Sequence, residues 1–402
     1  MRGLLGHFRV VAMLAVFAAF SATSHAQEAK PAPALEVVTM SDVFGRGEDG
    51  YPQVRIPAVV ATPKGVVLAF AEGRQGDDHS ENDIVLKRSL DGGATWQPLQ
   101  VVAEMGGDSL NDPCAVVLPE TGRVLLMYQR YPKGYHTQKM GNIESAELGF
   151  GGPRNTHSFL TRSEDDGVTW SAPEDIARNI RRPDAISVGS PGVGIQLKHG
   201  SHKGRILFPL YEVTPSADNS APCYNCAAIS DDAGVTWRVG ARIPEAKLKG
   251  EADECQLEEL GDGTVVMDAR QTGGNCRKGT RSRDAGETWE PMYNVPDLAA
   301  PPCMGSILRI AAAGEKDVLA ASMPNTPNER KNGTLFVSRD GGKTWPEKRV
   351  LYPGGFAYSC LTRLAGDRVG CLFERDEYAH IAFAVFDVRP LIVPGDSQQP
   401  SR

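Results

Sequence analysis

Several charged side chains stand at the ends of apolar, strand-like runs, where folding could gather them into one pocket. The chain is acidic, with a formal net charge of −7, so any anionic ligand must be held by local positive charge. Arginine suits a carboxylate ligand because its planar guanidinium makes two parallel charge-assisted hydrogen bonds and stays ionised at any working pH. The segments that combine a strand-like run with such residues are Arg55-Ile-Pro57, Ala69-Phe-Ala-Glu-Gly-Arg74, Asp253-Glu-Cys255, Met267-Asp-Ala-Arg270, Asn328-Glu-Arg-Lys-Asn332 and Phe356-Ala-Tyr-Ser359.

A repeated octapeptide, Ser-x-Asp-x-Gly-x-Thr-Trp, indicates how such segments are positioned, and internal repetition is the strongest guide to architecture. We interpret each copy as a β-turn in which Asp accepts backbone hydrogen bonds and Gly supplies a positive φ. Thr-Trp then begins an outgoing strand, and the Trp covers the hairpin base. We expect these turns to stabilise the fold rather than to catalyse. The copies contain all five tryptophans and run from Ser89 to Trp96, Ser163 to Trp170, Ser230 to Trp237, Ser282 to Trp289 and Ser338 to Trp345.

The spacing of the copies predicts an all-β fold, a six-bladed β-propeller of four-stranded antiparallel blades. The copies start 52 to 74 residues apart, and one propeller blade needs roughly 40–50 residues. One domain over residues 37–390 accommodates six blades, and we expect one terminus to add a strand to the other's sheet, which leaves no open edge. The longest insertion, from Arg130 to Thr156, is a candidate for the rim of a substrate site.

The N-terminus has the pattern of a secretory signal peptide, predicted over residues 1–26. Arg2 and Arg9 precede an apolar run from Val10 to Phe20, and small residues follow at a cleavage site. The run is too short to cross a bilayer comfortably, so we expect no membrane insertion. The sequence therefore predicts export to the periplasm or secretion, a lead-in over residues 27–36 and a C-terminal tail over residues 391–402.

Charge and cysteine content exclude other classes. Cleavage of the signal would remove two arginines and lower the net charge from −7 to −9, which disfavours nucleic acid as a partner. Cys223-x-x-Cys226 has no second pair at zinc spacing, so we expect no metal site. An oxidising compartment permits disulfides among the eight cysteines, but their connectivity cannot be deduced from sequence.

The octapeptide resembles the Asp-box of sialidase-type propellers. The Arg-Ile-Pro motif, the Phe-Ala-Glu-Gly-Arg strand end and the Asp-boxes also occur in the order typical of that family. Over nearly all of its mature part the chain thus resembles a secreted bacterial exo-α-sialidase. The resemblance implies a monomer that releases terminal sialic acids from sialylated glycans, glycoproteins or glycolipids, with retention and without metal or organic cofactor.

The resemblance also implies which residues bind the substrate. Three arginines from separate blades clamp the carboxylate of sialic acid, a glutamate braces the first of them, and two further residues contact the region of the sugar's 4-position. The matching positions are Arg55, Arg270 and Arg330 for the clamp, Glu374 for the brace, and Arg74 and Asp112 for the ring.

For catalysis, the resemblance implies Tyr358 as nucleophile and Glu254 as the base that takes its proton. A neutral phenol suits this substrate, because an anionic nucleophile about 4 Å from the substrate carboxylate would meet repulsion of about 4 kcal/mol at an effective dielectric constant of 20. We further expect neighbouring arginines to ease phenolate formation. Glu251, Glu258 and Glu259 are alternatives to Glu254, and we expect them to be solvated.

The resemblance also implies that the acid/base residue is an aspartate on the loop after the Phe-Ala-Glu-Gly-Arg strand. Counting back from Ile84 favours Asp78 and leaves Asp77 as an alternative. Two other functions remain open: a transglycosylating or eliminating sialidase, and a non-catalytic propeller that binds sialoglycans. Intact Tyr358 and Glu254 argue against pure binding, which needs neither.

Overall fold

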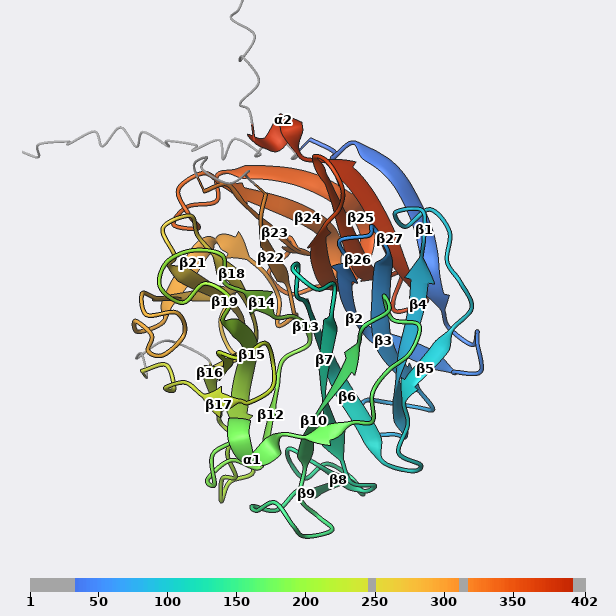
Figure 1. Ribbon diagram of the computed structural model, residues 1–402, viewed down its shortest axis with the longest axis vertical. Helices are drawn as coiled ribbons and strands as arrows, with labels where there is room; N and C mark the ends of the chain where they lie inside the picture. Colours follow the sequence, from blue (N-terminus) through green and yellow to red (C-terminus); the bar gives the residue numbers. More distant parts are fainter. Residues whose placement is uncertain (1–32, 245–250, 311–316, 393–402) are drawn as a thin grey trace, which may run out of the picture. The chain divides into compact units, whose positions relative to one another are not determined.

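Strands dominate the computed structural model, which describes residues 33–244, 251–310 and 317–392 (Figure 1). The helices of this part are α1 (Ala177–Ile180) and α2 (Arg389–Ile392), one turn each, so the all-β class is confirmed. The predicted signal peptide, residues 1–26, lies outside the described residues, as do most of the lead-in and nearly all of the C-terminal tail.

The strands form two large sheets. One has the order β1 (Val37–Gly45), β27 (His380–Asp387), β26 (Arg368–Arg375), β25 (Glu347–Arg363), β24 (Lys331–Ser338), β23 (Leu319–Pro324) and β22 (Ser306–Arg309). The other has the order β11 (Glu174–Asp175), β10 (His157–Ser163), β7 (Val124–Tyr131), β6 (Ser109–Val117), β4 (Asn82–Ser89), β3 (Val67–Arg74) and β2 (Gln53–Ala61), with β13 (Gly192–Val193) on β6 and β5 (Gln100–Ala103) on β4.

Three smaller sheets complete the described part. The first has the order β12 (Ser187–Gly189), β15 (Ile206–Val213), β16 (Cys223–Ser230) and β17 (Arg238–Val239), with β14 (Ile195–Gln196) on β15. The second has the order β18 (Ala252–Glu259), β19 (Val265–Gln271), β20 (Cys276–Ser282) and β21 (Tyr293–Ala299). The third pairs β8 (Tyr135–His136) with β9 (Glu144–Ser145).

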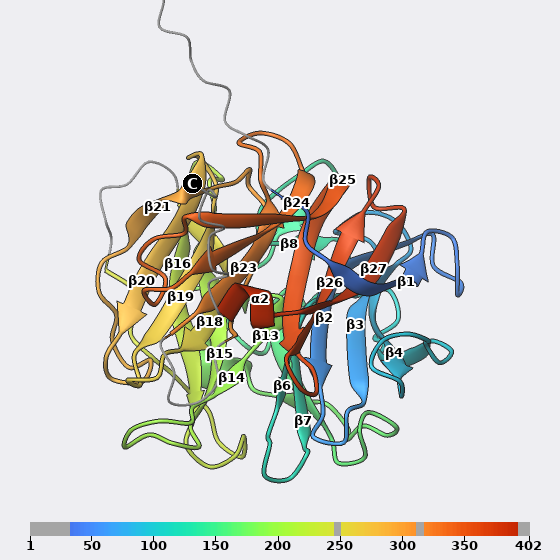
Figure 2. The same cartoon turned by 90° about the horizontal axis from the view of Figure 1, so that it is seen from above.

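The innermost strands of these sheets meet at a common centre. Strand β2 packs against β6 and β25, β18 packs against β15 and β22, and β13 contacts β2, β6, β18 and β25. At the outside, β1 pairs antiparallel with β27, so the first strand joins the sheet of the last, as Figure 2 shows. The sheets do not give a count of blades, because β25 runs for 17 residues from one group of strands into the next.

The octapeptides adopt the expected turns. In the first copy, Asp91 accepts hydrogen bonds from the backbone N–H groups of Ala94 and Thr95, at 3.1 and 2.9 Å. Gly93 has a φ of +98°, and a Cβ there would lie 2.3 Å from the Phe383 ring, so only glycine fits. One expectation was wrong: the tryptophans do not begin the outgoing strands. Those strands start one to four residues later, and each Trp lies in an irregular stretch between the turn and the strand.

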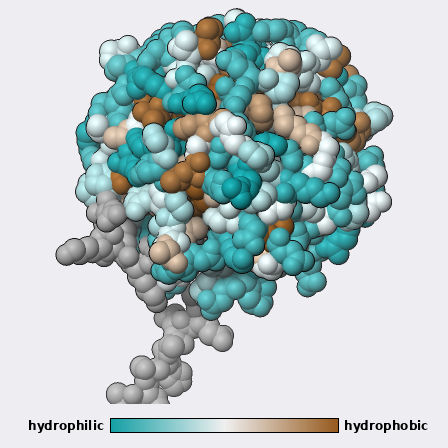
Figure 3. All heavy atoms as spheres, turned by 90° about the horizontal axis from the view of Figure 1, so that it is seen from below, coloured by the Kyte–Doolittle hydropathy of each residue, from teal (hydrophilic) through white to brown (hydrophobic). Residues whose placement is uncertain are grey.

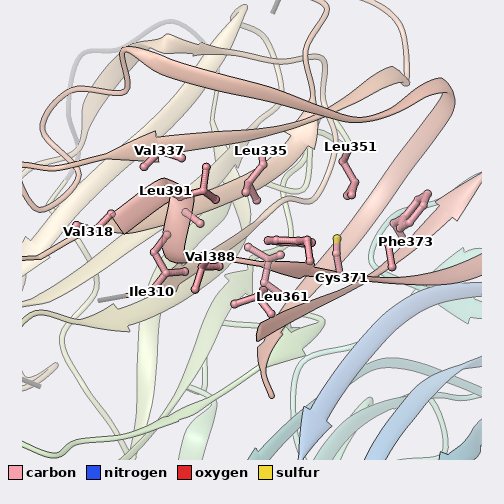
Figure 4. Close-up of a cluster of buried hydrophobic side chains, with 14 of the residues drawn as sticks. Ile310, Val318, Leu335, Val337, Leu351, Leu361, Cys371, Phe373, Val388 and Leu391 are labelled. Atoms are coloured by element: carbon pink, nitrogen blue, oxygen red, sulfur yellow. The ribbon is translucent and has the colours of Figure 1, made fainter. Parts of the chain in front are cut away.

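The core lies between neighbouring sheets. The cluster drawn in Figure 4 includes Leu335 of β24, Phe373 of β26 and Leu391 of α2. All eight cysteines are free thiols, and six of them are fully buried. Burial of such apolar surface stabilises the sheets by about 25 cal/mol per Å², and it holds the inner strands in the positions that the site requires.

Candidate active site

Four inner strands are irregular at the positions where the predicted site residues occur. The regular pairing is interrupted between Arg55 and Ala58 in β2, and likewise within β6, β18 and β25. A bulge turns side chains away from the normal alternation and is common beside active sites. The interruptions lie at or beside four predicted site residues: Arg55, Asp112, Glu254 and Tyr358.

Two of these bulges contain a strained residue that precedes a proline. Ile56 in Arg55-Ile56-Pro57 has a φ of +61°, and Asp112, which precedes Pro113, has a φ of +56°. A positive φ is an outlier for a β-branched residue and persists only where neighbours enforce it. The N–H of Ile56 donates a hydrogen bond to Glu374 at 2.9 Å, so the carboxylate that contacts Arg55 also holds Ile56 in this strained conformation.

Eight of the nine predicted site residues line one cavity of about 520 Å³; the ninth, Glu374, is buried behind Arg55. The insertion from Arg130 to Thr156 contributes Thr137, Gln138 and Met140 to its wall, as expected of a rim segment. The strands of that insertion lie at the lower end of Figure 1, and the surface on that side is mainly hydrophilic with separate hydrophobic patches (Figure 3).

Tyr358 and Glu254 are hydrogen-bonded at the floor of the cavity. The phenol of Tyr358 donates to Oε1 of Glu254 at 2.6 Å. Arg270 donates from Nη1 both to the phenol oxygen and to Oε2 of Glu254, each at 2.7 Å. Burial raises the pKa of Tyr358 well above its ordinary value, and this effect exceeds the opposing influence of Arg270 and Arg330. Arg270 and Arg330 do lower the pKa of Tyr358, as expected of arginines that ease phenolate formation, but burial has the larger effect.

Arg55 is paired with the buried carboxylate of Glu374. Its Nε donates to Oε1 at 2.6 Å and its Nη2 to Oε2 at 3.2 Å. The N–H of Tyr358 donates to Oε2 of the same glutamate at 3.1 Å. One carboxylate thus joins β26 to β2 and β25, and it fixes Arg55 relative to the backbone of Tyr358.

Arg330 differs from Arg55 and Arg270 in that its hydrogen-bond partners are uncharged oxygens. It donates to the hydroxyl of Tyr378 at 3.2 Å and to the carbonyl oxygen of Pro302 at 2.8 Å. Its guanidinium carbon lies 5.2 Å from the centroid of the Tyr358 ring. Arg55, Arg270 and Arg330 therefore surround the phenol, as a three-arginine clamp requires.

Arg74 lies between two carboxylates. Its Nη2 donates to the buried Glu72 at 2.6 Å, and its Nη1 is hydrogen-bonded to Asp78. Desolvation acts to raise the pKa of Asp78, but Arg74 and Arg55 hold it below its ordinary value. Asp112 behaves in the opposite way, because burial, together with Glu72 and Glu254, raises its pKa well above the ordinary value.

The loop after β3 distinguishes Asp78 from its neighbour. Asp78 lines the cavity, whereas Asp77 does not, and Asp77 accepts the backbone N–H of His79 at 2.9 Å. The ring of His79 packs edge-on to His136 at 4.3 Å, and His136 stacks on Tyr131 at 4.0 Å. Burial lowers the pKa of His136 to about 3, so it is neutral and acts as an aromatic support for the loop.

The alternatives to Glu254 have other environments. Glu251 lines the cavity, but no hydrogen bond joins its carboxylate to Tyr358. The expectation that Glu258 and Glu259 are solvated was wrong. Glu259 is buried and accepts the N–H groups of Lys198 and His199, and Glu258 accepts that of Arg309 at 2.7 Å. Both line a separate cavity of about 610 Å³ towards the end of β18.

Sequence reasoning assigned no role to several residues that complete the site. Glu72 lies two positions before Arg74 on β3, and this period-two spacing, which puts both side chains on one face, could have identified it. Asp253, 3.6 Å from Arg270, was adjacent to a residue that was identified. His136 lies in the insertion predicted to form the rim but was given no role, and nothing in the sequence pointed to Tyr378.

Within residues 33–244, 251–310 and 317–392, no group of three or more His, Cys, Asp or Glu side chains is placed to hold a metal ion. In the same residues, no helix is long and apolar enough to cross a membrane.

The family model described as a BNR repeat-like domain matches residues 65–371. The chain belongs to this family. Its relatives include a sialidase of Micromonospora viridifaciens, 33% identical over 84% of this chain and 52% of the relative, and a sialidase of Bacteroides fragilis, 29% identical over 86% and 64%. The chain thus spans between one half and two thirds of the length of these two relatives.

Solved structures of sialidases share the fold. The Hadza microbial sialidase Hz136 superposes with a TM-score of 0.77 at 27% identity, covering 88% of this chain and 69% of that one. An intramolecular trans-sialidase from Ruminococcus gnavus superposes with a TM-score of 0.72 at 20% identity, covering 88% and 98%. The fold is therefore the one that these sialidases adopt.

Proposed function

We propose that this protein is a retaining exo-α-sialidase that removes terminal sialic acids from glycoconjugates through a covalent intermediate on Tyr358. The observation that carries the proposal is the hydrogen bond of 2.6 Å from Tyr358 to Glu254 within a cavity lined by three arginines. A phenol that can lose its proton to a carboxylate is a nucleophile. Three guanidinium groups around it select a substrate with a carboxylate on the reacting carbon.

The first half of the reaction forms the bond to the protein. Arg55, Arg270 and Arg330 hold the substrate carboxylate, and Asp78 donates a proton to the glycosidic oxygen as the bond to the anomeric carbon breaks. The oxygen of Tyr358 bonds to that carbon, and its proton passes to Glu254. The arginines hold the pKa of Asp78 low in the free protein. A bound anion weakens their field, which raises this pKa and favours the protonated acid.

The second half reverses these roles. Asp78, now ionised, takes a proton from water, and the water oxygen bonds to the anomeric carbon. The bond to Tyr358 breaks, and the phenol recovers its proton from Glu254. Two displacements at one carbon give overall retention. Neutral Tyr358 suits the first step because a carboxylate nucleophile would be repelled by the substrate carboxylate.

The proposal extends to the location, the oligomeric state and the blade number of the protein. We infer an exported protein, periplasmic or secreted, that acts as a monomer on sialylated glycans. We also infer six blades around the site. Consecutive pairing of β2 to β5, and of β18 to β21, supports groups of four strands, and the contacts among the inner strands support a closed ring.

The direct test is Tyr358→Phe, assayed on a fluorogenic sialoside with the fold checked by circular dichroism. We expect turnover to fall by at least about 100-fold, because the nucleophile is lost. Undiminished turnover would remove Tyr358 from this role. NMR of the products separates free sialic acid from anhydro, unsaturated or transferred products. Glycan binding without any sugar release would favour a binding module.

A further inference from the structure

The three clamp arginines differ in how their charge is balanced. Arg55 is paired with Glu374, and Arg270 with Glu254. For Arg330 no ion pair is found in the part of the chain that the structure describes, and its hydrogen bonds go to the neutral oxygens of Tyr378 and Pro302. Like charges repel strongly in a partly dry pocket, and the groups that hold Arg330 are neutral.

Tyr378 contacts both of these arginines. The guanidinium carbon of Arg55 lies 3.8 Å from the centroid of its ring, a close cation–π contact. The hydroxyl of the same side chain accepts the hydrogen bond from Arg330 at 3.2 Å. Tyr378 is half-buried and does not line the cavity where the phenol of Tyr358 lies; it lines a neighbouring cavity of about 530 Å³ with Arg330 and Glu374.

The backbone that carries Tyr378 is strained. Asp376, Glu377 and Tyr378 have φ values of +51°, +54° and +65° in the turn between β26 and β27. Three consecutive non-glycine residues in the left-handed region are disfavoured, since each Cβ approaches the following carbonyl oxygen. Such strain persists only where the surroundings impose it, and it is concentrated at functional sites.

The surroundings that impose this turn belong to the strand that carries Tyr358. The N–H of Asp376 donates to the carbonyl oxygen of Gly355 at 3.1 Å, and the hydroxyl of Tyr352 donates to the carboxylate of Asp376 at 2.7 Å. A Cβ at Gly355 would lie 3.2 Å from the backbone nitrogens of Asp376 and Glu377, so glycine permits this close approach. The turn is thus fastened to β25, three residues before the proposed nucleophile; Figure 2 shows β25, β26 and β27 as neighbours.

From this geometry we propose that Tyr378 is a positioning residue that sets the distance and orientation of Arg55 and Arg330 for a ligand carboxylate. The aromatic ring separates two cations without adding charge, and the hydroxyl orients the guanidinium that lacks an acidic partner. The inference rests on the proposed function, because it assumes that the ligand of these arginines is the carboxylate of a sialic acid.

The test compares binding of a 2,3-unsaturated sialic acid analogue with binding of its methyl ester, by calorimetry. This analogue has no glycosidic bond to hydrolyse, so the measurement does not depend on turnover. For the wild type we expect the acid to bind at least about 100-fold more tightly than the ester, since the ester cannot accept bidentate charge-assisted hydrogen bonds.

Two variants at the same position separate ring from hydroxyl. Tyr378→Leu should reduce the acid-to-ester ratio at least about tenfold, because both contacts are lost, while affinity for the ester changes less than about twofold. Tyr378→Phe keeps the ring and should reduce the ratio about threefold. Tyr224→Leu is the matched control: it removes a ring 4.7 Å from Arg242, outside the cavity, and should leave the ratio unchanged.

The outcomes are decisive in each direction. A wild-type ratio in Tyr378→Leu overturns the proposal, whether or not the variant melts at a lower temperature. If that variant does not fold, an unchanged ratio in Tyr378→Phe overturns it instead. A wild type that prefers the acid but releases no sialic acid contradicts only the proposed hydrolysis. A wild type without this preference overturns both.

Discussion

The carboxylate of Glu254 is hydrogen-bonded to Tyr358 and Arg270 at the same time. One oxygen accepts a hydrogen bond from the phenol at 2.6 Å, and the other accepts one from the guanidinium at 2.7 Å. Arg270 donates to the phenol oxygen as well, which closes a triangle of hydrogen bonds. The base, the nucleophile and one of the carboxylate-binding arginines are therefore fixed relative to one another before any substrate arrives. Such preorganisation reduces the rearrangement needed at the moment of reaction.

Glu254→Gln tests the base. An amide keeps the size and an acceptor for Arg270 but cannot take the phenol's proton, so we expect kcat to fall about 10²- to 10⁴-fold with a much smaller change in KM. Glu251→Gln is the matched control, since Glu251 lines the same cavity without reaching Tyr358. Steady-state kinetics on a fluorogenic sialoside measure both. A larger loss in Glu251→Gln would transfer the role to that residue.

Asp78→Asn and Asp77→Asn test the acid/base residue as a pair. Asp78→Asn has no proton donor, so its kcat on sialosides with a poor leaving group should fall about 10²- to 10³-fold. An aryl sialoside, whose leaving group needs less protonation, should lose much less. Asp77→Asn should stay within about twofold of wild type, because Asp77 does not line the cavity and bonds to its own loop. Equal losses on the two kinds of substrate would contradict general-acid catalysis by Asp78.

The pKa of Asp112 predicts a pH-dependent stability. Burial raises this pKa in the folded state, so the folded protein binds the proton more tightly than the unfolded chain does. This stabilisation is fully present below about pH 3.9, the pKa of an aspartate in the unfolded chain. As the pH rises from there towards the pKa of Asp112 in the folded protein, about 1.4 kcal/mol is lost per pH unit.

Asp112→Asn should remove that dependence, because an amide does not titrate. Urea unfolding at pH 4 and pH 7 should show the variant gaining stability relative to wild type at the higher pH. The same difference in unfolding free energy at both pH values would show that Asp112 titrates normally in the folded protein.

The octapeptide turns predict an effect on stability alone. The carboxylate of Asp284 accepts hydrogen bonds from the N–H of Thr288 at 2.9 Å and from the hydroxyl of Thr288 at 2.5 Å. Asp284→Ala should lower the free energy of unfolding by about 1–3 kcal/mol, because the turn loses charge-assisted hydrogen bonds, and should leave kcat and KM unchanged. Glu290→Ala, which removes an exposed partner of Arg283, should change stability by less than about 0.5 kcal/mol. An altered KM in Asp284→Ala would contradict a purely structural turn.

The eight predicted residues that line the cavity could be found from sequence because each stands in or beside a short motif with its own chemistry. Tyr378 could not be predicted, since its position depends on a left-handed turn that the residue types Asp-Glu-Tyr disfavour. The burial of Glu259 depends on backbone N–H groups of a segment some 60 positions away. The high pKa of Tyr358 reflects the balance between burial and nearby arginines, which requires coordinates.

The central claim is that Tyr358 becomes covalently bound to the sugar. A sialyl fluoride with fluorine at the neighbouring ring carbon should slow the second displacement, so that the adduct accumulates and can be located by peptide mass spectrometry. We predict a sialyl adduct on the peptide that contains Tyr358, and none in Tyr358→Phe. An adduct on Glu254 or Asp78, or inactivation without any adduct, would contradict the account.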